Sequence, residues 1–266
     1  AFQIQNLLVA YKERFDKDNF IKNLLLDNLL LVDIYNRAKK LHIETNVKRV
    51  VFLIETKNEK DTNALETMRS LFSTKTKDFI TAVDEKNIIL VREVKPGETY
   101  EDLEKTANTI LDMLNTEAMS KVRISFGTIV GEIKDVSRSY KEAKMALDVG
   151  KIFYSSKNVV AYSNLGIAKV TGYLNIRKDP NEAANVIGTL SDGSACEILE
   201  TLDGWYKISS GGIPGYVKSE YILTGDAAKD AAMSHAELMA IVHADRLNAR
   251  TEPSTDAKIW TQISEN

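Results

Sequence analysis

The side chains that could carry out chemistry in this sequence are few. Asp84 and Glu85 are adjacent carboxylates, and such a pair can hold Mg²⁺ through its oxygens. Lys86 would place a positive charge beside that ion, however, and residues 84–87 have the composition of a solvated hairpin turn. The sequence therefore predicts no catalytic residue in this segment, and no other segment offers a catalytic group.

Histidine and cysteine also indicate no site. His235 and His243 are eight residues apart and His42 is remote, so the sequence predicts neither a metal site nor a cofactor. A single cysteine cannot form a disulfide within the chain. Cys196 alternates with Ile198 in a strand-like run, which is typical of a small buried hydrophobic residue rather than a nucleophile.

Noncovalent recognition is indicated instead by aromatic and polar side chains in the C-terminal third. Such rings can stack on an extended peptide while their polar tips form hydrogen bonds. The candidate ligand-binding residues are Tyr173, Asn175, Asp179, Asp203, Trp205 and Tyr216. Because Trp205 and Tyr206 alternate along a predicted strand, we expect one ring in the core and the other facing outward, and either place is open to Trp205.

A short phrase occurs twice in this third, 73 residues apart. The two copies are Leu174-Asn175-Ile176-Arg177 followed by Pro180, and Leu247-Asn248-Ala249-Arg250 followed by Pro253. The second copy reaches only Ile263, the counterpart of Leu190. We therefore expect tandem β modules of which the second is incomplete, and a tail that is disordered or ordered only against a neighbour.

Turn residues separate short strand-like runs throughout the first β module. Asp192-Gly193, Asp203-Gly204 and Gly211-Gly212 recur about every ten residues, which is typical of a small barrel. Its expected core residues are Val186, Leu190, Ile198, Ile208 and Val217.

Helices and strands alternate in the N-terminal part. Strands are expected at 47–56, 79–83, 88–91 and 122–130, and helices at 61–72, 100–114 and 136–149. The apolar run Val50 to Ile54 is typical of a central strand covered on both faces. The order of these elements predicts an α+β sandwich with one layer of sheet and one of helix.

The first residues have the spacing of a helix that pairs with a copy of itself. Ile4, Leu8, Tyr11 and Phe15 are separated by four, three and four positions. We expect a homodimer through these N-terminal helices. Asp18 is then expected to cap a second helix.

Several segments of the N-terminal part resemble a known domain. They are Phe20-Ile21-Lys22-Asn23-Leu24-Leu25, Ala38-Lys39-Lys40-Leu41-His42-Ile43, Ile124-Ser125-Phe126-Gly127, Ser139-Tyr140-Lys141-Glu142-Ala143 and Tyr162-Ser163-Asn164-Leu165-Gly166-Ile167. They are similar to the GGDEF-like domain of sugar-diacid-regulator (CdaR/PucR-type) transcription regulators. The resemblance implies a cytoplasmic regulatory domain of ferredoxin-like fold, related to cyclic di-GMP cyclases but without their activity.

Two departures bear on that resemblance. A diguanylate cyclase needs a glycine pair at its hairpin so that backbone can approach a triphosphate, and residues 84–87 contain no glycine. The helix-turn-helix domain that normally follows the Leu-Gly-Ile segment in these regulators does not follow it here. We therefore expect neither nucleotide turnover nor direct DNA binding.

The C-terminal β module resembles a bacterial SH3-like (SH3b) domain. The resemblance runs from Ala168 to Leu223 and includes Gly204-Trp205-Tyr206-Lys207-Ile208 and Gly215-Tyr216-Val217. It implies noncatalytic recognition of peptidoglycan peptides or other envelope ligands, in a protein that acts outside the membrane.

Composition is that of ordinary globular protein. The chain has 266 residues, of which 44% are hydrophobic and 27% charged, and this length favours two domains. Residues 1–166 contain 26 Lys/Arg and 24 Asp/Glu, and the remainder contains 9 and 14, so neither part is basic enough to hold nucleic acid by phosphate contacts alone. Asp27, Asn28 and Asp33 interrupt the most apolar run, and we expect no membrane span.

The predicted domains are an N-terminal helix at 1–17, a GGDEF-like regulatory domain at 18–167, an SH3-like domain at 168–224, a linker at 225–238 and an incomplete second SH3-like repeat at 239–266. We expect a noncatalytic protein that joins a regulatory, dimerising domain to a ligand-binding module. One alternative is a protein that binds the cell wall through the SH3-like module alone, and another is a degenerate cyclase relative that binds nucleotide.

The two modules imply different compartments and meet abruptly between Gly166 and Lys169. An artificial fusion, a misjoined gene and an unusual natural protein would each explain this junction. The abruptness and the partial second repeat favour a joined origin.

Overall fold

The computed structural model describes residues 2–57, 62–72, 77–154, 157–235, 246–250 and 258–264. The chain divides into two compact units, Ala1–Ser234 and His235–Asn266, and each is described by itself. Among the described helices, none combines the length and apolar character that crossing a membrane requires.

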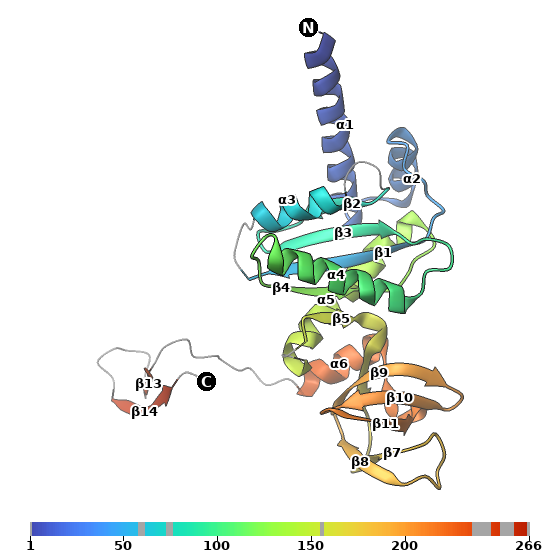
Figure 1. The fold of residues 1–266 in the computed structure, drawn as a ribbon, viewed down its shortest axis with the longest axis vertical. Coiled ribbons are helices and arrows are strands. Elements are labelled where there is room, and N and C mark those ends of the chain that lie inside the picture. Colours follow the sequence, from blue (N-terminus) through green and yellow to red (C-terminus); the bar gives the residue numbers. More distant parts are fainter. Residues whose placement is uncertain are drawn as a thin grey trace. The chain divides into compact units, whose positions relative to one another are not determined.

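The first half of the larger unit contains a five-stranded sheet with the order β2-β3-β1-β4-β5 (Figure 1). Its strands are β1 (Arg49–Thr56), β2 (Phe79–Ala82), β3 (Asn87–Glu93), β4 (Val122–Phe126) and β5 (Val159–Ala161). Neighbouring strands are antiparallel except for the parallel pair β4 and β5. The predicted hairpin across residues 84–87 is confirmed, because β2 and β3 flank it.

Helices cover both faces of this sheet, rather than forming the single layer that the order of elements predicts. One face carries α1 (Phe2–Leu25), α2 (Leu31–Lys40) and α5 (Val136–Phe153), and the other carries α3 (Thr62–Leu71) and α4 (Tyr100–Thr116). Along β1, Val51 and Leu53 contact the first group, whereas Val50, Phe52 and Ile54 contact the second. Two cores explain why β1 is apolar at successive positions.

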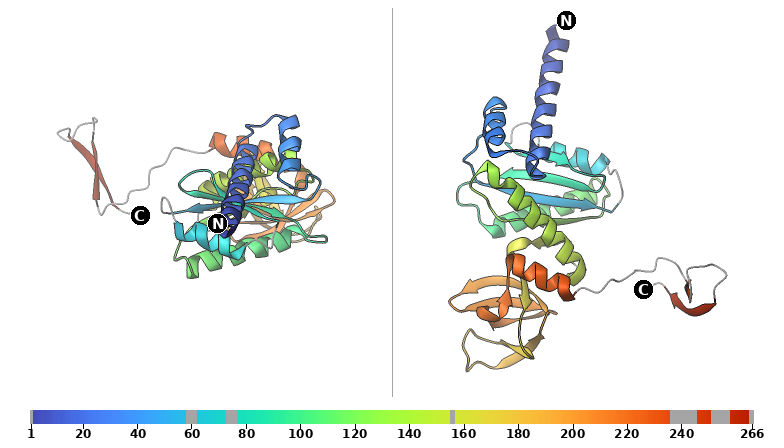
Figure 2. Two further views of the ribbon diagram at one scale, coloured as in Figure 1. Left: turned by 90° about the horizontal axis from the view of Figure 1, so that it is seen from above. Right: turned by 180° about the vertical axis from the view of Figure 1, so that it is seen from behind.

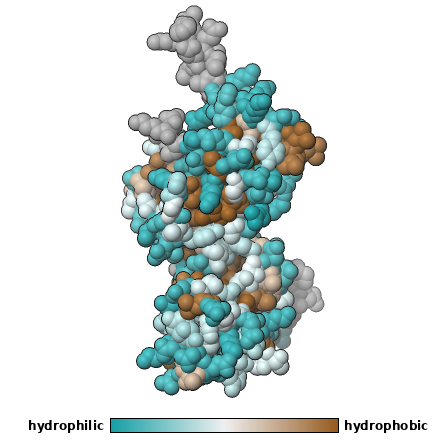
Figure 3. Space-filling model, turned by 90° about the vertical axis from the view of Figure 1, so that its right-hand side faces the viewer, coloured by the Kyte–Doolittle hydropathy of each residue, from teal (hydrophilic) through white to brown (hydrophobic). Residues whose placement is uncertain are grey.

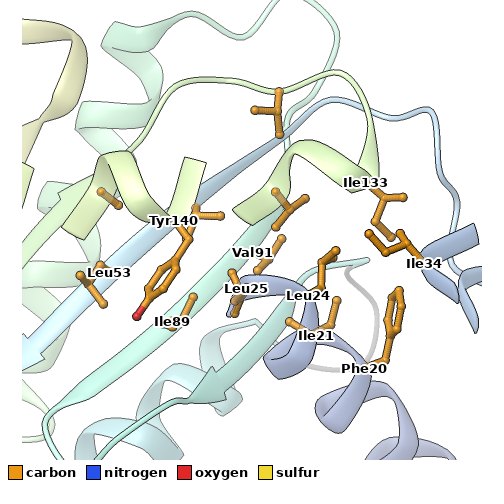
Figure 4. Close-up of a cluster of buried hydrophobic side chains, with 14 of the residues drawn as sticks. Phe20, Ile21, Leu24, Leu25, Ile34, Leu53, Ile89, Val91, Ile133 and Tyr140 are labelled. Atoms are coloured by element: carbon orange, nitrogen blue, oxygen red, sulfur yellow. The ribbon is translucent and has the colours of Figure 1, made fainter. Parts of the chain in front are cut away.

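The predicted helix start at Asp18 is wrong. Helix α1 continues through this residue without a break, and Asp18 forms an ion pair of 3.2 Å with Lys22 one turn later. The last turns of α1 point apolar side chains toward the sheet and α5, as Figure 4 shows for Phe20, Ile21, Leu24 and Leu25. Burial of these side chains holds a single long helix in place where the sequence suggested two.

The second half of the larger unit contains a seven-stranded sheet, drawn in yellow to orange in Figure 2. The order of its strands is β12-β6-β9-β10-β11-β7-β8. Its strands are β6 (Leu165–Ala168), β7 (Tyr173–Arg177), β8 (Val186–Ser191), β9 (Ala195–Leu202), β10 (Trp205–Ser210), β11 (Ile213–Lys218) and β12 (Ile222–Leu223). Short 3-10 turns occur at η1 (Ile133–Asp135), η2 (Tyr162–Asn164) and η3 (Ser219–Tyr221). The fold is therefore α+β followed by a small all-β barrel-like sheet, as the sequence predicts.

Four of the five expected core residues of this β module are buried, together with Cys196. They are Leu190, Ile198, Ile208 and Val217. The prediction for Val186 is wrong, since its side chain is 49% exposed. Val186 begins the edge strand β8 beside an irregularity in the pairing with β7, where no neighbouring strand covers it among the described residues.

The junction between the two halves is a strand and not a linker. The predicted domain boundary between residues 167 and 168 falls inside β6, which lies between β9 and β12 in the second sheet. The predicted linker at 225–238 begins with α6 (Gly225–His235), whose Ala228 and Ala232 are buried. These alanines share a core, the junction core, with Met145, Ala146 and Val149 of α5 and with Leu165 and Ile167 of β6.

In the smaller unit, the described residues form an antiparallel pair, β13 (Arg246–Arg250) with β14 (Ile259–Ser264). Leu247 lies opposite Ile263 as Leu174 lies opposite Leu190, and both hairpins shift register at the same place. The described residues of the tail therefore pair with each other in the same register as the first hairpin of the barrel. Their assignment to a second SH3-like repeat stays a prediction. Ile241, His243 and Pro253 lie outside the described residues.

Candidate functional site

A groove of about 900 Å³ opens on the second sheet, along β7 and the residues around it. Its lining combines three aromatic rings with side chains of both charges. The residues that line it are Lys169, Val170, Thr171, Tyr173, Leu174, Asn175, Arg177, Glu182, Asp192, Trp205, Lys218 and Tyr221.

The structure brings three of the six predicted ligand-binding residues into this groove. Tyr173, Asn175 and Trp205 line it, and Tyr173 is 69% exposed. Tyr206 packs against the barrel core, so the outward place in the pair belongs to Trp205. Tyr206 lies opposite buried Val217 of β11 and therefore faces the core. Because side chains alternate along a strand, the preceding residue Trp205 faces outward.

The other three predicted residues do not line the groove. Asp179 and Asp203 are in the exposed turns after β7 and before β10. Tyr216 is half-buried in β11, opposite Arg177 of β7. It precedes the groove residue Lys218 by two positions, so it lies on the same face of the strand but outside the lining.

Charged residues of the groove were missed by sequence reasoning. Lys169, Arg177, Glu182, Asp192 and Lys218 come from separate segments, and only the fold brings them together. A signal was present in Arg177, which belongs to the repeated phrase and has Arg250 as its counterpart. Tyr221 was a further signal, as an aromatic residue at the end of the module.

Hydrogen bonds fix several of these charges. The Arg177 guanidinium donates to the carbonyl oxygen of Ala184 at 2.8 Å, and the Asp192 carboxylate accepts from the backbone N–H of Val170 at 2.9 Å. Lys218 pairs with Glu182, and the hydrogen bond that Lys218 donates lowers the pKa of the Glu182 carboxyl. In the part of the chain that the structure describes, Lys169 forms no ion pair, so its ammonium group faces solvent at the groove.

A smaller hollow of about 460 Å³ adjoins the groove. Glu182, Trp205 and Lys218 line both, so Trp205 and the ion pair stand between the two. A ligand longer than the groove could therefore cross Trp205 into the second hollow. This arrangement suits an extended chain more than a compact small molecule.

The Asp84 carboxylate at the β2–β3 hairpin forms hydrogen bonds within the turn. Oδ1 of Asp84 accepts from the backbone N–H groups of Lys86 and Asn87 at 2.9 and 2.8 Å, and the Asn87 amide donates to both carboxylate oxygens. Burial opposes ionisation of Asp84, but these hydrogen bonds and the charge of Lys144 lower its pKa overall. Within the described ranges, no group of three His, Cys, Asp or Glu side chains is placed to hold a metal ion.

Ser139 and Glu142, from one of the family-like segments of the first half, form hydrogen bonds within the fold. Ser139 Oγ donates to the carbonyl oxygen of Thr128 at 2.8 Å and accepts from the N–H of Val51 at 3.1 Å. The Glu142 carboxylate accepts from the N–H of Thr128 at 2.7 Å. These contacts fasten α5 to the end of β4 and to β1, so the segment from Ser139 to Ala143 helps to hold the sandwich together.

Comparisons with known proteins agree with both halves. A family model for a GGDEF-like domain matches residues 28–149, and a model for a bacterial SH3 domain matches residues 172–222. A curated relative, "Putative N-acetylmuramoyl-L-alanine amidase YrvJ" of Bacillus subtilis (strain 168), is 32% identical over 96 residues, which cover 34% of this chain. The matched region spans 18% of the amidase.

Solved structures give partial matches. A microbial GGDEF domain studied with cyclic di-GMP is 15% identical and has a TM-score of 0.35, covering 54% of this chain and 92% of that one. NlpC2 from Trichomonas vaginalis is 24% identical and has a TM-score of 0.22, covering 23% of each chain. On the family models, the chain carries a GGDEF-like domain followed by a bacterial SH3 domain.

Proposed function

We propose that this protein is a noncatalytic binding protein whose bacterial SH3 domain holds a peptide of the cell envelope. The observation that carries this proposal is the groove, where Tyr173, Trp205 and Tyr221 lie among charges of both signs. Exposed aromatic rings offer flat faces to a peptide backbone and its small side chains. The relative's name points to the same material, since a muramoyl-alanine linkage joins wall sugar to wall peptide.

Charge complementarity supports a peptide over a plain sugar. Lys169 can meet a carboxylate, and the Glu182–Lys218 pair beside Trp205 presents both charges to a ligand that crosses it. A wall peptide carries both kinds of group along an extended backbone. The rings between the charges would then exclude water from the contact and set the position of the peptide.

We further propose that the GGDEF-like domain is a regulatory and self-associating module without cyclase activity. Support comes from the hairpin, where Asp84 is engaged by the turn and no glycine leaves room for a triphosphate. Incubation with GTP and Mg²⁺ should give no cyclic dinucleotide. Turnover that disappears in Asp84→Asn or Glu85→Gln would contradict this part of the proposal and leave the SH3 domain unaffected.

Cosedimentation with purified insoluble peptidoglycan tests the binding proposal. The full chain should pellet with the wall material, and Tyr173→Ala and Trp205→Ala should each weaken retention by about tenfold, because loss of a central aromatic contact costs about 1–2 kcal/mol. Leu199→Ala is the matched control, since Leu199 is exposed on β9 and lines neither hollow.

Thermal unfolding of each variant separates lost binding from lost structure. Tyr173 and Trp205 lie outside the barrel core, so their variants should keep the melting temperature of the wild type. Equal retention of the wild type and both aromatic variants would show that the groove is not the binding site.

A further inference from the structure

Helix α1 carries two sets of apolar residues at different places along its length. The C-terminal set is at most 2% exposed and packs on the sheet and α5 (Figure 4). It consists of Phe20, Ile21, Leu24 and Leu25. The N-terminal set, which we call the seam, consists of positions 4, 8, 11 and 15.

Helical geometry places the two sets on different sides. At about 100° per residue, the four seam positions fall within a stripe about 60° wide, and its centre lies about 140° from the centre of the C-terminal set. The helix is unbroken from Phe2 to Leu25, so the two stripes keep this relation. The surface that buries Leu24 therefore cannot cover the seam.

The protein's own domain leaves the end of the seam that lies nearest to it uncovered. In Figure 1 the N-terminal part of α1 projects away from the five-stranded sheet. Phe15, the last seam residue, is 60% exposed. Figure 3 shows that other apolar residues are also exposed among hydrophilic ones on one face of the molecule. A helical extension of this length gains little stability in water by itself, so a partner that covers the seam would stabilise it.

The spacing of the seam is that of a coiled coil, for which a second copy of α1 offers a matching helix. Alternation of four and three positions is the repeat by which two identical helices interlock, with knobs of one entering holes of the other. The next two seam positions are Asp18 and Lys22, which pair with each other instead of extending the stripe. The seam therefore ends where α1 enters the domain, and about two heptads remain for association.

Charge allows the two helices to run in the same direction. In parallel register, the positions that flank the seam would bring Lys12 beside Leu7 of the second helix and Arg14 beside Asn19. Neither of these pairs sets like charges against each other. We infer that α1 forms a parallel two-stranded coiled coil with α1 of a second copy of this chain.

Sedimentation of the full chain over roughly 1–300 µM tests this inference, since two heptads support only a weak dimer. The apparent mass should rise from 29.7 kDa toward twice that value. Leu8→Asp and Phe15→Asp should weaken association at least tenfold, whereas Val9→Asp, on another side of the helix, should not. A wild type that stays monomeric, or dimers that persist in both seam variants, would overturn the inference.

Cross-linking tests the parallel register. In a chain that carries Cys196→Ala, Phe15→Cys should form a disulfide with its counterpart under mild oxidation, because equivalent seam positions meet in parallel helices. Glu13→Cys, outside the seam, should not. Dimers that form without a Phe15→Cys cross-link would contradict the parallel arrangement, and unchanged melting temperatures would show that the variants are folded.

Discussion

Gly127 lies where the end of β4 passes beneath α5. A Cβ atom at this residue would lie 2.1 Å from the backbone oxygen of Ser139 and 2.7 Å from its Oγ. The Oγ atom of the same serine accepts a hydrogen bond from the backbone N–H of Val51 in β1 and donates one to the carbonyl oxygen of Thr128. The glycine therefore permits a close approach that the hydrogen bonds of Ser139 require.

Gly127→Ala should destabilise the protein by about 3 kcal/mol or more, because the methyl group meets backbone that cannot move without breaking these bonds. Gly131→Ala is the control, since beyond its chain neighbours no described atom lies within 4 Å of the place a Cβ would occupy there. That change should stay within about 0.5 kcal/mol. Denaturant midpoints measure both. Equal midpoints for the two variants would argue against tight packing of α5 on β4.

Cys196 is buried in the barrel, and burial raises the pKa of its thiol from 9.0 to about 12. The folded state therefore keeps the proton after the unfolded chain has lost it. The thiol's contribution to stability is fully present below pH 9 and is lost as pH rises from 9 toward 12.

The free energy of unfolding of the wild type minus that of Cys196→Ala should accordingly fall over this pH window. Other titrating groups are common to both proteins and cancel in the difference. A difference that stays constant up to pH 12 would mean that the thiol ionises equally well in the folded state.

At the level of elements, the sequence predicted those whose signal lies in a run of consecutive residues or in a repeated phrase. The run Val50–Ile54 predicts β1 because both of its faces meet helices, and Asp84–Asn87 predicts a turn that closes on its own hydrogen bonds. Repetition of the Leu-Asn-x-Arg phrase gave the equivalence of two hairpins. Such signals depend on neighbours in sequence, so they can be read without the fold.

Features that depend on packing between segments far apart in sequence were not predicted. Asp18 has the type of a helix cap, but burial of Phe20 and Ile21 carries α1 through it. Val186 has the type of a core residue, yet it begins an edge strand. Three of the six predicted residues lie in the candidate site, and two of them, Tyr173 and Trp205, are aromatic residues that are conspicuous in sequence. The charged residues of the site were not predicted, because they meet only when several segments converge.

At the scale of the whole molecule, the junction core ties the GGDEF-like domain to the SH3 domain. Met145 and Val149 of α5 share it with Ile167 of β6 and with Ala232 of α6. Lys157, which follows α5, also pairs with Glu197 of β9. A shared apolar core of this kind favours unfolding of the two domains in one transition.

Ala232→Glu should break this coupling, because a carboxylate would enter an apolar core in which Ala232 is fully buried. We expect the single thermal transition of the wild type to split or broaden in calorimetry. Met233→Glu should leave it unchanged, since Met233 is exposed on the same helix. Two separate transitions already present in the wild type would show that the domains unfold independently.

Strand β6 has a mechanical consequence. It is hydrogen-bonded on both sides, to β9 and to β12, and only the short turn η2 separates it from β5 of the other sheet. Tension applied to an anchored SH3 domain would thus load β6 in shear and reach the first sheet with almost no slack to absorb it. A protein built this way would transmit a pull where a flexible tether would dissipate it.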